Sequence, residues 1–471
     1  MNHISGQTVL PLDGSGVPLP DGTSSFSRTE PGSGSTRGTP FKDPAFTENR
    51  AQPVHRWVPW IAGFSAGFVD DCLTEYLPEA TPNEAVVCDP FAGVGTTLVA
   101  AHHRGFSTAG FEINPWAALA ARSKLAAGSV SLAEFSTWRA AYREFMAEAA
   151  GSGQAPDLAL VPPGFRSRIP FFSPAVLRQV LWTLRFFQGI GDAAIRDLFL
   201  VSFGSVMIRF SNYSYEPSLA SRPGAGKPLI EDADVAGIMV AKLREMADDC
   251  AVVQRDVGQL LPAPPTRVIQ DSIFHADQYL PPNTVDLAIT SPPYLNNYHY
   301  VRNTRPHLFW LNFIADTAGL RDIEHASFGK FWQTVRDRER VPLDVSLPGL
   351  EALLEDLRSR NSERGPYGGP GWANYAAQYF NDTARLCAVF THLLKPGGRI
   401  VVVIGNSILQ GLEIPVDEFL AQIGELEGLE REAIHRLRAK RVGNSIIRSS
   451  VRTDAGSVAS LYEVAVVLRK P

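Results

Sequence analysis

Short apolar runs alternate with stretches of helical periodicity over most of the chain. The runs that end at Asp89 and Glu112 enclose a glycine-bearing turn and a helical pattern that begins near Thr96. A second helical stretch, W-A-A-L-A-A-R-S-K-L-A-A, follows the second run. Strand, turn, helix and strand of these lengths are typical of a parallel βαβ unit, so this part of the chain is predicted to be α/β.

Further apolar runs extend the pattern to seven predicted strands. They are T-R-V-I-Q-D, T-V-D-L-A-I-T, I-V-V-V-I-G-N-S, L-E-R-E-A-I-H-R-L and L-Y-E-V-A-V-V-L-R-K. The run I-V-V-V-I is apolar at every position, which is typical of a strand buried on both faces of a sheet. The last two runs follow each other closely enough to form an antiparallel pair at the sheet edge. The predicted fold class is therefore a Rossmann-like α/β sheet of seven strands.

Three segments depart from this alternation. Residues 1–45 are rich in Gly, Ser, Thr, Pro and Asp, a composition that buries too little apolar surface to fold, so we predict a disordered tail. Residues 131–263 show helical periodicity and few strand-like runs, which predicts a mostly helical insertion. The polar stretch 315–371 is predicted to be a second insertion. The α/β domain is then discontinuous, over 46–130 and 264–471.

Composition and charge are those of an ordinary folded protein. The chain is 45% apolar and 20% charged, and its formal net charge is −5. A local basic face can exist on a slightly acidic protein, so this charge neither predicts nor excludes a nucleic-acid partner. No apolar run reaches the roughly 18 residues of a membrane span, and the N-terminus lacks the pattern of a secretory signal.

The cysteine spacing predicts no metal site. Cys72, Cys88, Cys250 and Cys387 form no C-x-x-C pair, and their spacing matches no zinc pattern. We therefore predict buried free thiols, as in a reducing, cytoplasmic setting. The pair His102-His103 also has no neighbouring ligand partners in the sequence, so it is not interpreted as a metal site.

The first candidate site is D-P-F-A-G-V-G-T-T, which begins at Asp89 between a strand and a helix. Glycines at such a turn let the backbone approach a ligand closely, and the helix N-terminus offers free N–H groups. Glu112 ends the next strand, where an acid can accept both hydroxyls of a ribose. No G-K-[ST] follows, and the motif is not a full G-x-G-x-x-G. Taken alone, a tight turn in some other α/β protein is the alternative.

The second candidate site is Ser291-Pro292-Pro293-Tyr294, again at the carboxyl end of a strand, where open parallel sheets bind ligands. Proline has no backbone N–H, so the two prolines can only accept hydrogen bonds. The Ser291 side chain and the Pro292 carbonyl match the two hydrogens of an exocyclic amino group. The Tyr294 ring is placed to stack on a planar base. A proline-rich strand exit without a ligand is the alternative.

Together, D-P-F-A-G-V-G-T-T, F-E-I-N-P and S-P-P-Y resemble the motifs of S-adenosylmethionine-dependent DNA amino-methyltransferases, which methylate N4 of cytosine or N6 of adenine. H-R-W-V-P-W-I-A-G-F-S, Y-L-N-N-Y-H-Y-V-R-N-T-R-P-H-L-F-W-L and L-K-P-G-G-R-I-V-V-V-I-G-N-S extend the resemblance, which covers roughly 46–130 and 268–471. The resemblance implies a class I methyltransferase fold, S-adenosylmethionine as cofactor, and a target base flipped out of double-stranded DNA. The cofactor loop precedes the catalytic loop here, whereas several family members have the opposite order.

The resemblance also assigns roles to individual residues. Glu112 would hold the ribose hydroxyls, Asp271 would contact adenine, and Phe64 would flank the methionine part of the cofactor. The full cofactor set is Phe64, Asp89, Pro90, Phe91, Ala92, Gly93, Gly95, Thr96, Glu112 and Asp271. Ser291, Pro292, Pro293 and Tyr294 would hold the target base.

Phosphate contacts are predicted for basic residues near the end of the chain and after the catalytic loop. They are Arg302, Arg305, Arg438, Lys440, Arg441 and Arg448. A solvated basic surface is the alternative interpretation of these side chains. The insertions 131–263 and 315–371 are equal candidates for reading the DNA sequence.

Serine at the first position of S-P-P-Y favours N4 of cytosine within this family, since adenine enzymes more often carry Asp or Asn there. N6 of adenine is the first alternative. The second alternative is an RNA amino-methyltransferase, such as those that modify guanosine in transfer RNA, which have the same motif order. A catalytically silent DNA-binding subunit is a third, which the intact S-P-P-Y disfavours. A cognate restriction or defence-system component is a candidate partner.

Overall fold

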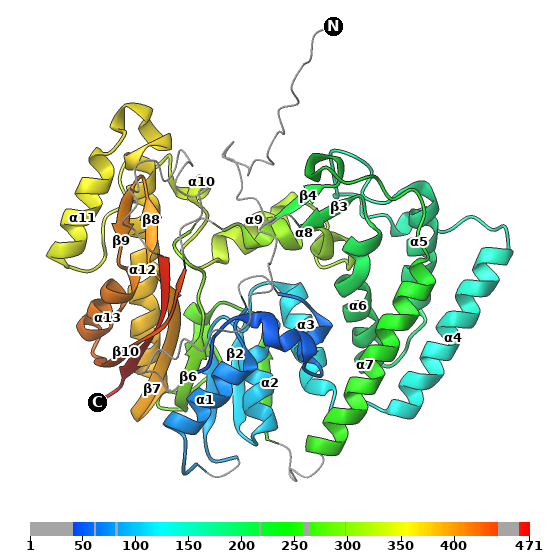
Figure 1. Cartoon of the computed structure of the whole chain (residues 1–471), viewed down its shortest axis with the longest axis horizontal. Coiled ribbons are helices and arrows are strands. Elements are labelled where there is room, and N and C mark those ends of the chain that lie inside the picture. The colour runs from blue at the N-terminus through cyan, green and yellow to red at the C-terminus, as the bar shows by residue number, and fades with distance from the viewer. Residues whose placement is uncertain are drawn as a thin grey trace, which may run out of the picture.

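The computed structural model of the chain describes residues 41–60, 63–80, 83–215, 218–257, 264–296, 298–440 and 461–471. Figure 1 shows a central sheet with helices on both faces and a second group of helices to one side. Nearly all of the predicted tail lies outside the described residues, and so do the predicted phosphate-binding residues Arg441 and Arg448. At Lys440 only the backbone is described.

The central sheet has seven strands in the order β10-β11-β7-β6-β1-β2-β5. β1, β2, β5, β6 and β7 pair in parallel, whereas β11 is antiparallel to both of its neighbours, β7 and β10. This order is that of the Rossmann-like class I methyltransferase fold, so the predicted fold class and its antiparallel edge pair are confirmed. The strands are β1 (Val86–Asp89), β2 (Ser107–Phe111), β5 (Thr266–Ile269), β6 (Val285–Thr290), β7 (Leu394–Gly405), β10 (Glu430–Lys440) and β11 (Leu461–Arg469).

The second half of strand β7, I-V-V-V-I, is apolar at every position because the sheet is covered on both faces there. Successive side chains of a strand point to opposite faces of the sheet. Val401 and Val403 pack into the core under α1 (Ala66–Tyr76) and α2 (Thr96–His103). Ile400, Val402 and Ile404 pack into the opposite core, under α12 (Gly369–Leu393) and α13 (Val416–Leu426). Both faces are covered here, so every position from Ile400 to Gly405 is buried.

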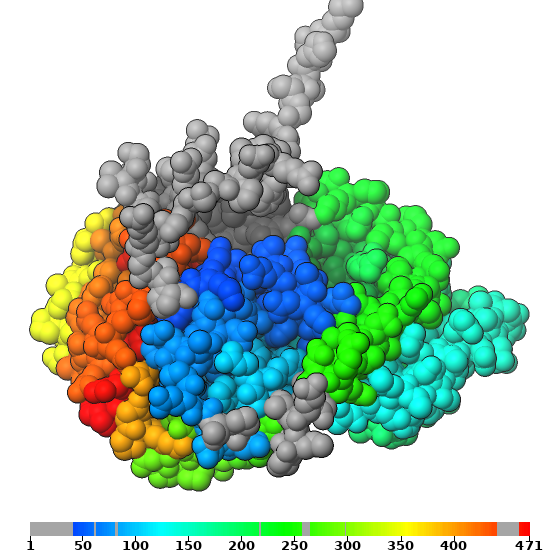
Figure 2. Space-filling view, turned by 60° about the horizontal axis from the view of Figure 1, so that its bottom comes forward, coloured from blue at the N-terminus to red at the C-terminus, as the bar shows by residue number. Residues whose placement is uncertain are grey.

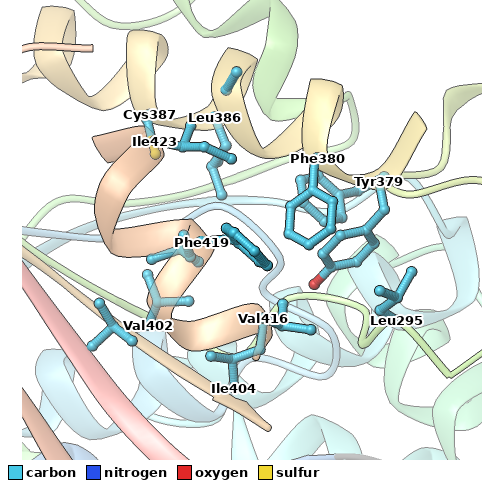
Figure 3. Close-up of a cluster of buried hydrophobic side chains, with 14 of the residues drawn as sticks. Leu295, Tyr379, Phe380, Leu386, Cys387, Val402, Ile404, Val416, Phe419 and Ile423 are labelled. Atoms are coloured by element: carbon cyan, nitrogen blue, oxygen red, sulfur yellow. The ribbon is translucent and has the colours of Figure 1, made fainter. Parts of the chain in front are cut away.

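The core between α12, α13 and the sheet is drawn in Figure 3. The rings of Phe380 and Phe419 meet edge to face, with centroids 5.6 Å apart. Tyr379, the neighbour of Phe380 on α12, lies beside Leu295, which follows the S-P-P-Y corner (Figure 3). Its hydroxyl donates a hydrogen bond to the carbonyl of Pro293 at 3.0 Å. The apolar packing of α12 therefore holds the Tyr379 hydroxyl against the S-P-P-Y corner.

Residues 131–263 contain a group of helices and a short hairpin, β3 (Tyr213–Tyr215) with β4 (Leu219–Ser221). Their aromatic-rich core is continuous with α3 (Pro115–Ala126) of the sheet domain. These helices, at the right of Figure 1, are α4 (Leu132–Gly151), α5 (Pro174–Gln188), α6 (Ala193–Val206) and α7 (Val235–Val257).

A buried carboxylate fastens α7 to the segment that precedes the cofactor loop. Asp249 accepts hydrogen bonds from the N–H of Val54 and the indole of Trp57, both at 2.9 Å. It also pairs with the guanidinium of Arg56 at 2.5 Å. Figure 2 shows this N-terminal segment, in dark blue, on the surface between the C-terminal strands and the green helices of the insertion.

The second insertion lies between α8 (Tyr300–Trp310) and α12. It contains α9 (Thr317–Ala326), α10 (Trp332–Val335) and α11 (Pro348–Ser359). Trp332 stacks on Trp372 of α12, with ring centroids 5.0 Å apart. This packing places the segment between α9 and α10 over the carboxyl ends of the strands. A small hairpin, β8 (Ser407–Leu409) with β9 (Leu412–Ile414), follows β7.

The predicted state of the cysteines is confirmed, since all four are buried free thiols. In the part of the chain that the structure describes, no helix is long and apolar enough to cross a membrane. Within the same ranges, no three His, Cys, Asp or Glu side chains gather where they could hold a metal ion.

Candidate functional site

The two sequence motifs meet at one pocket at the carboxyl ends of the parallel strands, although 201 residues separate Asp89 from Thr290. Parallel strands end at the same edge of a sheet, which is where ligands bind in open α/β folds. The predicted residues Asp89, Gly95 and Pro292 are not part of its lining. Those that line it are Phe64, Pro90, Phe91, Ala92, Gly93, Thr96, Glu112, Asp271, Ser291, Pro293 and Tyr294.

Asp89 lies beneath the pocket and joins the two motifs. Its side chain is 1% exposed. One oxygen accepts hydrogen bonds from the N–H of Phe91 at 3.0 Å and from the hydroxyl of Thr290 at 2.7 Å. Burial raises the pKa of Asp89 to about 6, and the hydrogen bonds from Thr290, Thr97 and the Phe91 N–H oppose that shift. The first residue of the D-P-F-A-G-V-G-T-T loop thus also fixes Thr290, the last residue of the strand that precedes S-P-P-Y.

The turn after Asp89 requires glycine at two positions. Gly93 and Gly95 have φ of +50° and +84°, in the left-handed region that side chains disfavour. A Cβ atom at Gly95 would lie 2.9 Å from the Cβ of Ala121 in α3. Glycine at this position therefore lets the N-terminus of α2 pack closely on α3 and leaves the pocket side of the turn open.

Glu112 faces this turn from the end of β2. Its two carboxylate oxygens accept hydrogen bonds from the N–H of Asn114 at 2.7 Å and of Gly93 at 2.8 Å. Burial raises the pKa of Glu112 to about 7, against the effect of these two hydrogen bonds. Each oxygen keeps lone-pair capacity, so the carboxylate is suited to accept two neighbouring hydroxyls of a ligand.

Asp271 lines the pocket at the end of β5 and is held in one orientation. One oxygen accepts the N–H of Ser272 at 2.7 Å and lies 2.9 Å from the His275 ring, and the other accepts the Tyr279 hydroxyl at 2.8 Å. Partial burial opposes the change, but the hydrogen bonds from His275 and Tyr279 lower the pKa of Asp271. A charged acceptor therefore marks the end of the pocket opposite S-P-P-Y.

The S-P-P-Y corner is fixed by contacts outside the motif. Tyr379 holds the Pro293 carbonyl, and the Ser407 hydroxyl donates to the carbonyl of Leu295. The Ser291 hydroxyl lies 3.5 Å from that of Tyr294. Burial strongly raises the pKa of the Tyr294 phenol, which therefore stays neutral. Ser291 and Tyr294 face the pocket, whereas Pro292 is buried.

Aromatic side chains that the motifs did not identify complete the wall. Phe328 meets Phe91 edge to face at 5.1 Å and Tyr379 at 5.2 Å. His299 lies 3.1 Å from Glu324 and packs on Phe331. Part of this wall could have been predicted from the run Tyr298-His299-Tyr300 soon after S-P-P-Y. No motif indicates that the second insertion contributes Phe328 and Phe331. The added aromatic set is Trp60, Tyr298, Tyr300, Phe328, Phe331, Tyr375 and Tyr379.

The predicted phosphate-binding residues occupy two separate places. Arg438 on β10 forms an ion pair with Glu463 and lies 3.5 Å from Asp43. Arg302 and Arg305 on α8 line a different hollow, together with Arg166 and Arg168 of the helical insertion. Arg305 also lies over the ring of Phe165.

Comparison with known proteins gives relatives over most of the chain. No family model matches it. The chain is 23% identical over 443 residues to the Type II methyltransferase M.BsoBI of Geobacillus stearothermophilus, which covers 85% of this chain and 83% of that protein. It is 24% identical over 450 residues to the Type II methyltransferase M.AvaI of Nostoc sp., with coverage of 91% and 88%.

Likeness to solved structures is weaker. An rRNA methyltransferase from Streptomyces viridochromogenes shares 11% identity over 88% of this chain and 87% of its own, with a TM-score of 0.29. A geranyl diphosphate methyltransferase in complex with sinefungin shares 8% identity over 92% and 90%, with a TM-score of 0.30. The fold assignment rests on the order and directions of the strands.

Proposed function

We propose that this chain transfers a methyl group from S-adenosylmethionine to an exocyclic amino group of a base flipped out of double-stranded DNA at a specific site. Similarity to Type II methyltransferases over more than four fifths of each chain supports site-specific methylation of DNA. The observation that carries the proposal is the hydrogen bond from Thr290 to Asp89, which brings the cofactor loop and S-P-P-Y to one pocket.

The residues present fit S-adenosylmethionine, which supplies a methyl group already activated on a positively charged sulfur. Glu112, with lone pairs free beside two backbone N–H donors, would accept the two ribose hydroxyls. Asp271 would face the adenine from the end of β5. The bare Cα of Gly93 would leave room for the chain that carries the sulfur, next to Trp60.

The S-P-P-Y corner would act on the base. Exocyclic amines are poor nucleophiles because their lone pair is delocalised into the ring. The Ser291 oxygen and the carbonyls of the corner would accept the two N–H groups and favour a more tetrahedral nitrogen, an electrostatic effect fixed in advance by the fold. Stacking on the Tyr294 ring, worth about 1–3 kcal/mol, would offset part of the few kcal/mol that flipping a base costs.

Positioning is the other contribution of this chain. Alignment of nitrogen, methyl and sulfur can supply several kcal/mol of the barrier reduction. The bond between Asp89 and Thr290 and the bond between Tyr379 and Pro293 hold the two loops in fixed register. We propose N4 of cytosine as the acceptor, from the serine at position 291, with N6 of adenine as the alternative.

Transfer of labelled methyl groups tests the substrate class. Purified protein should label duplex DNA, and Tyr294→Ala should abolish turnover while leaving the affinity for S-adenosylmethionine unchanged. Labelling of transfer RNA without labelling of DNA would overturn the proposed substrate. An unchanged rate in Tyr294→Ala would refute the placement of the target base.

A further inference from the structure

We propose that the duplex lies along the helical insertion 131–263, against a cationic face formed by Arg50, Arg166, Arg168, Arg209, Arg222 and Arg302. This inference rests on the proposed function and assigns its DNA-binding surface, for which the sequence left the insertions 131–263 and 315–371 as equal candidates.

Two hollows beside the pocket define the cationic face. Arg166, Arg168 and Arg302 line the first hollow, and Arg50, Arg209 and Arg222 line the second. Tyr213 of the β3–β4 hairpin belongs to both hollows. The second hollow also shares Trp60, Tyr298 and Tyr300 with the candidate site. The cationic face is therefore continuous with the pocket that would receive the flipped base.

The charge of this face is unusual for the chain. Asp and Glu number 49 against 44 Lys and Arg in the whole sequence, yet no acidic residue is among the described residues that line either hollow. None of the six arginines forms an ion pair with a carboxylate that the structure describes. Uncompensated guanidinium groups around an open surface suit an anionic ligand with many phosphates.

Backbone contacts hold some of these guanidinium groups without neutralising them. Arg166 donates to the carbonyl of Pro163 at 2.6 Å, and Arg222 donates to the carbonyl of Pro228 at 2.7 Å. A guanidinium has five N–H donors, so each arginine keeps donors for a phosphate. Arg166, Arg168 and Arg209 are exposed, and a ligand can therefore reach them without a change in the fold.

The second insertion is engaged elsewhere. Glu324, Phe328 and Phe331 line the candidate site itself. Two of its arginines are neutralised, Arg340 by Glu355 at 2.5 Å and Arg360 by Asp356 at 3.1 Å. On the other side of the sheet, Arg438 is paired with Glu463 and Asp43. Lys330 of this insertion lines the pocket, and its ammonium donates to the carbonyls of His325 at 2.5 Å and Ser327 at 3.1 Å. The arginines that cluster beside the pocket without a described carboxylate partner therefore lie on and around insertion 131–263.

A matched pair of double variants tests the assignment. Arg166→Gln with Arg209→Gln removes one charge from each hollow. Arg143→Gln with Arg185→Gln removes two exposed arginines from α4 and α5 that line neither hollow. Fluorescence anisotropy with a labelled duplex, repeated over a range of salt concentrations, gives Kd and its salt dependence, and calorimetry with S-adenosylmethionine reports whether each variant is folded.

The double variant of the cationic face should bind duplex about 10- to 30-fold more weakly near 0.15 M salt. The slope of log Kd against log salt concentration should fall by about two, because each lost phosphate contact lowers it by about one. The control should bind within about twofold of wild type, and both should keep their affinity for S-adenosylmethionine. Wild-type-like duplex binding and salt slope in the Arg166, Arg209 variant would overturn this inference while leaving methylation of DNA intact. Failure of the wild-type protein to methylate any duplex, with transfer to RNA, would overturn the proposed function and this inference together.

Discussion

At the scale of single residues, the site depends on two buried carboxyls. Burial raises the pKa of Asp89 to about 6 and that of Glu112 to about 7, above their unfolded values of 3.8 and 4.5. A carboxyl whose folded pKa is raised contributes stability that is fully present below its unfolded pKa and is lost as pH rises through its folded pKa. The free energy of unfolding should therefore fall between about pH 4 and pH 7, as Asp89 and Glu112 lose their protons. Holding these two buried carboxylates in the ionised form costs this stability.

Glu112→Gln tests the role of the second carboxyl. The variant should bind S-adenosylmethionine about 10- to 100-fold more weakly, because a hydrogen bond to a charged group is worth about 1.5–3 kcal/mol. In the wild type, the affinity should rise between pH 6 and pH 8 as Glu112 loses its proton, and in the variant this rise should disappear. Calorimetric titration at three pH values measures both effects. An equal pH dependence in the two proteins would show that Glu112 does not accept the ligand.

Tyr379→Phe tests the support of the S-P-P-Y corner. The variant keeps the ring in the core but loses the 3.0 Å hydrogen bond to the Pro293 carbonyl. We expect a fall in kcat of about tenfold with the affinity for S-adenosylmethionine unchanged, because the corner loses its fixed position. Tyr142→Phe is the control, since it breaks a 2.9 Å bond to Thr183 inside the helical insertion. Tyr379→Phe and Tyr142→Phe should each lose about 1 kcal/mol of stability. If the two variants have the same kcat, Tyr379 has no positioning role.

At the scale of elements, the insertion is tied to the sheet domain by a few directed contacts. Asp249 on α7 accepts from Val54 and Trp57 and pairs with Arg56, and a ring nitrogen of His307 on α8 donates to the carbonyl of Gly204 on α6 at 3.0 Å. The segment next to Arg56 continues into Trp60, which lines both the pocket and the second hollow. The position of α7 is therefore coupled to the position of the candidate site.

Asp249→Ala should loosen this connection. The substitution leaves the buried N–H groups of Val54 and Trp57 without their acceptor, and each unsatisfied buried donor costs about 1–3 kcal/mol. We expect a lower Tm and faster hydrogen exchange in α7 and around residues 54–57. Asp248→Ala, at the exposed neighbouring position, should change neither. Similar exchange rates in the two variants would show that the ion pair does not fasten α7.

The strands and the two motifs show how much of the fold and of the candidate site the sequence could predict. Every strand of the sheet was predicted, because each contains apolar residues in a strand-like pattern and the I-V-V-V-I run of β7 is apolar at every position. The two motifs were found because their residues are contiguous and lie at strand ends. Phe328 and Phe331 could not be found, since their place in the pocket depends on how Trp332 packs on Trp372, far along the chain. Asp89 was expected in the pocket lining but lies beneath it, because its carboxylate turns to the hydroxyl of Thr290, 201 residues away in the sequence.

At the scale of the whole molecule, charge is divided by function. The pocket is lined by aromatic rings and by three acidic residues, Glu112, Asp271 and Glu324, with Lys330 beside them. The cationic face next to it is lined by arginines and by no acidic residue that the structure describes. A net charge of −5 conceals this division. Among the basic residues near the end of the chain that the sequence singled out, Arg438 is neutralised by Glu463. Composition alone could not distinguish paired from unpaired arginines.

Nucleoside mass spectrometry of DNA from cells that express the protein tests the central claim most directly. The DNA should contain N4-methylcytosine, and DNA from cells that express Tyr294→Ala should not. N6-methyladenine without modified cytosine would keep the enzyme class and change the base. DNA that carries no methylated exocyclic amine in cells with abundant wild-type protein would contradict the account.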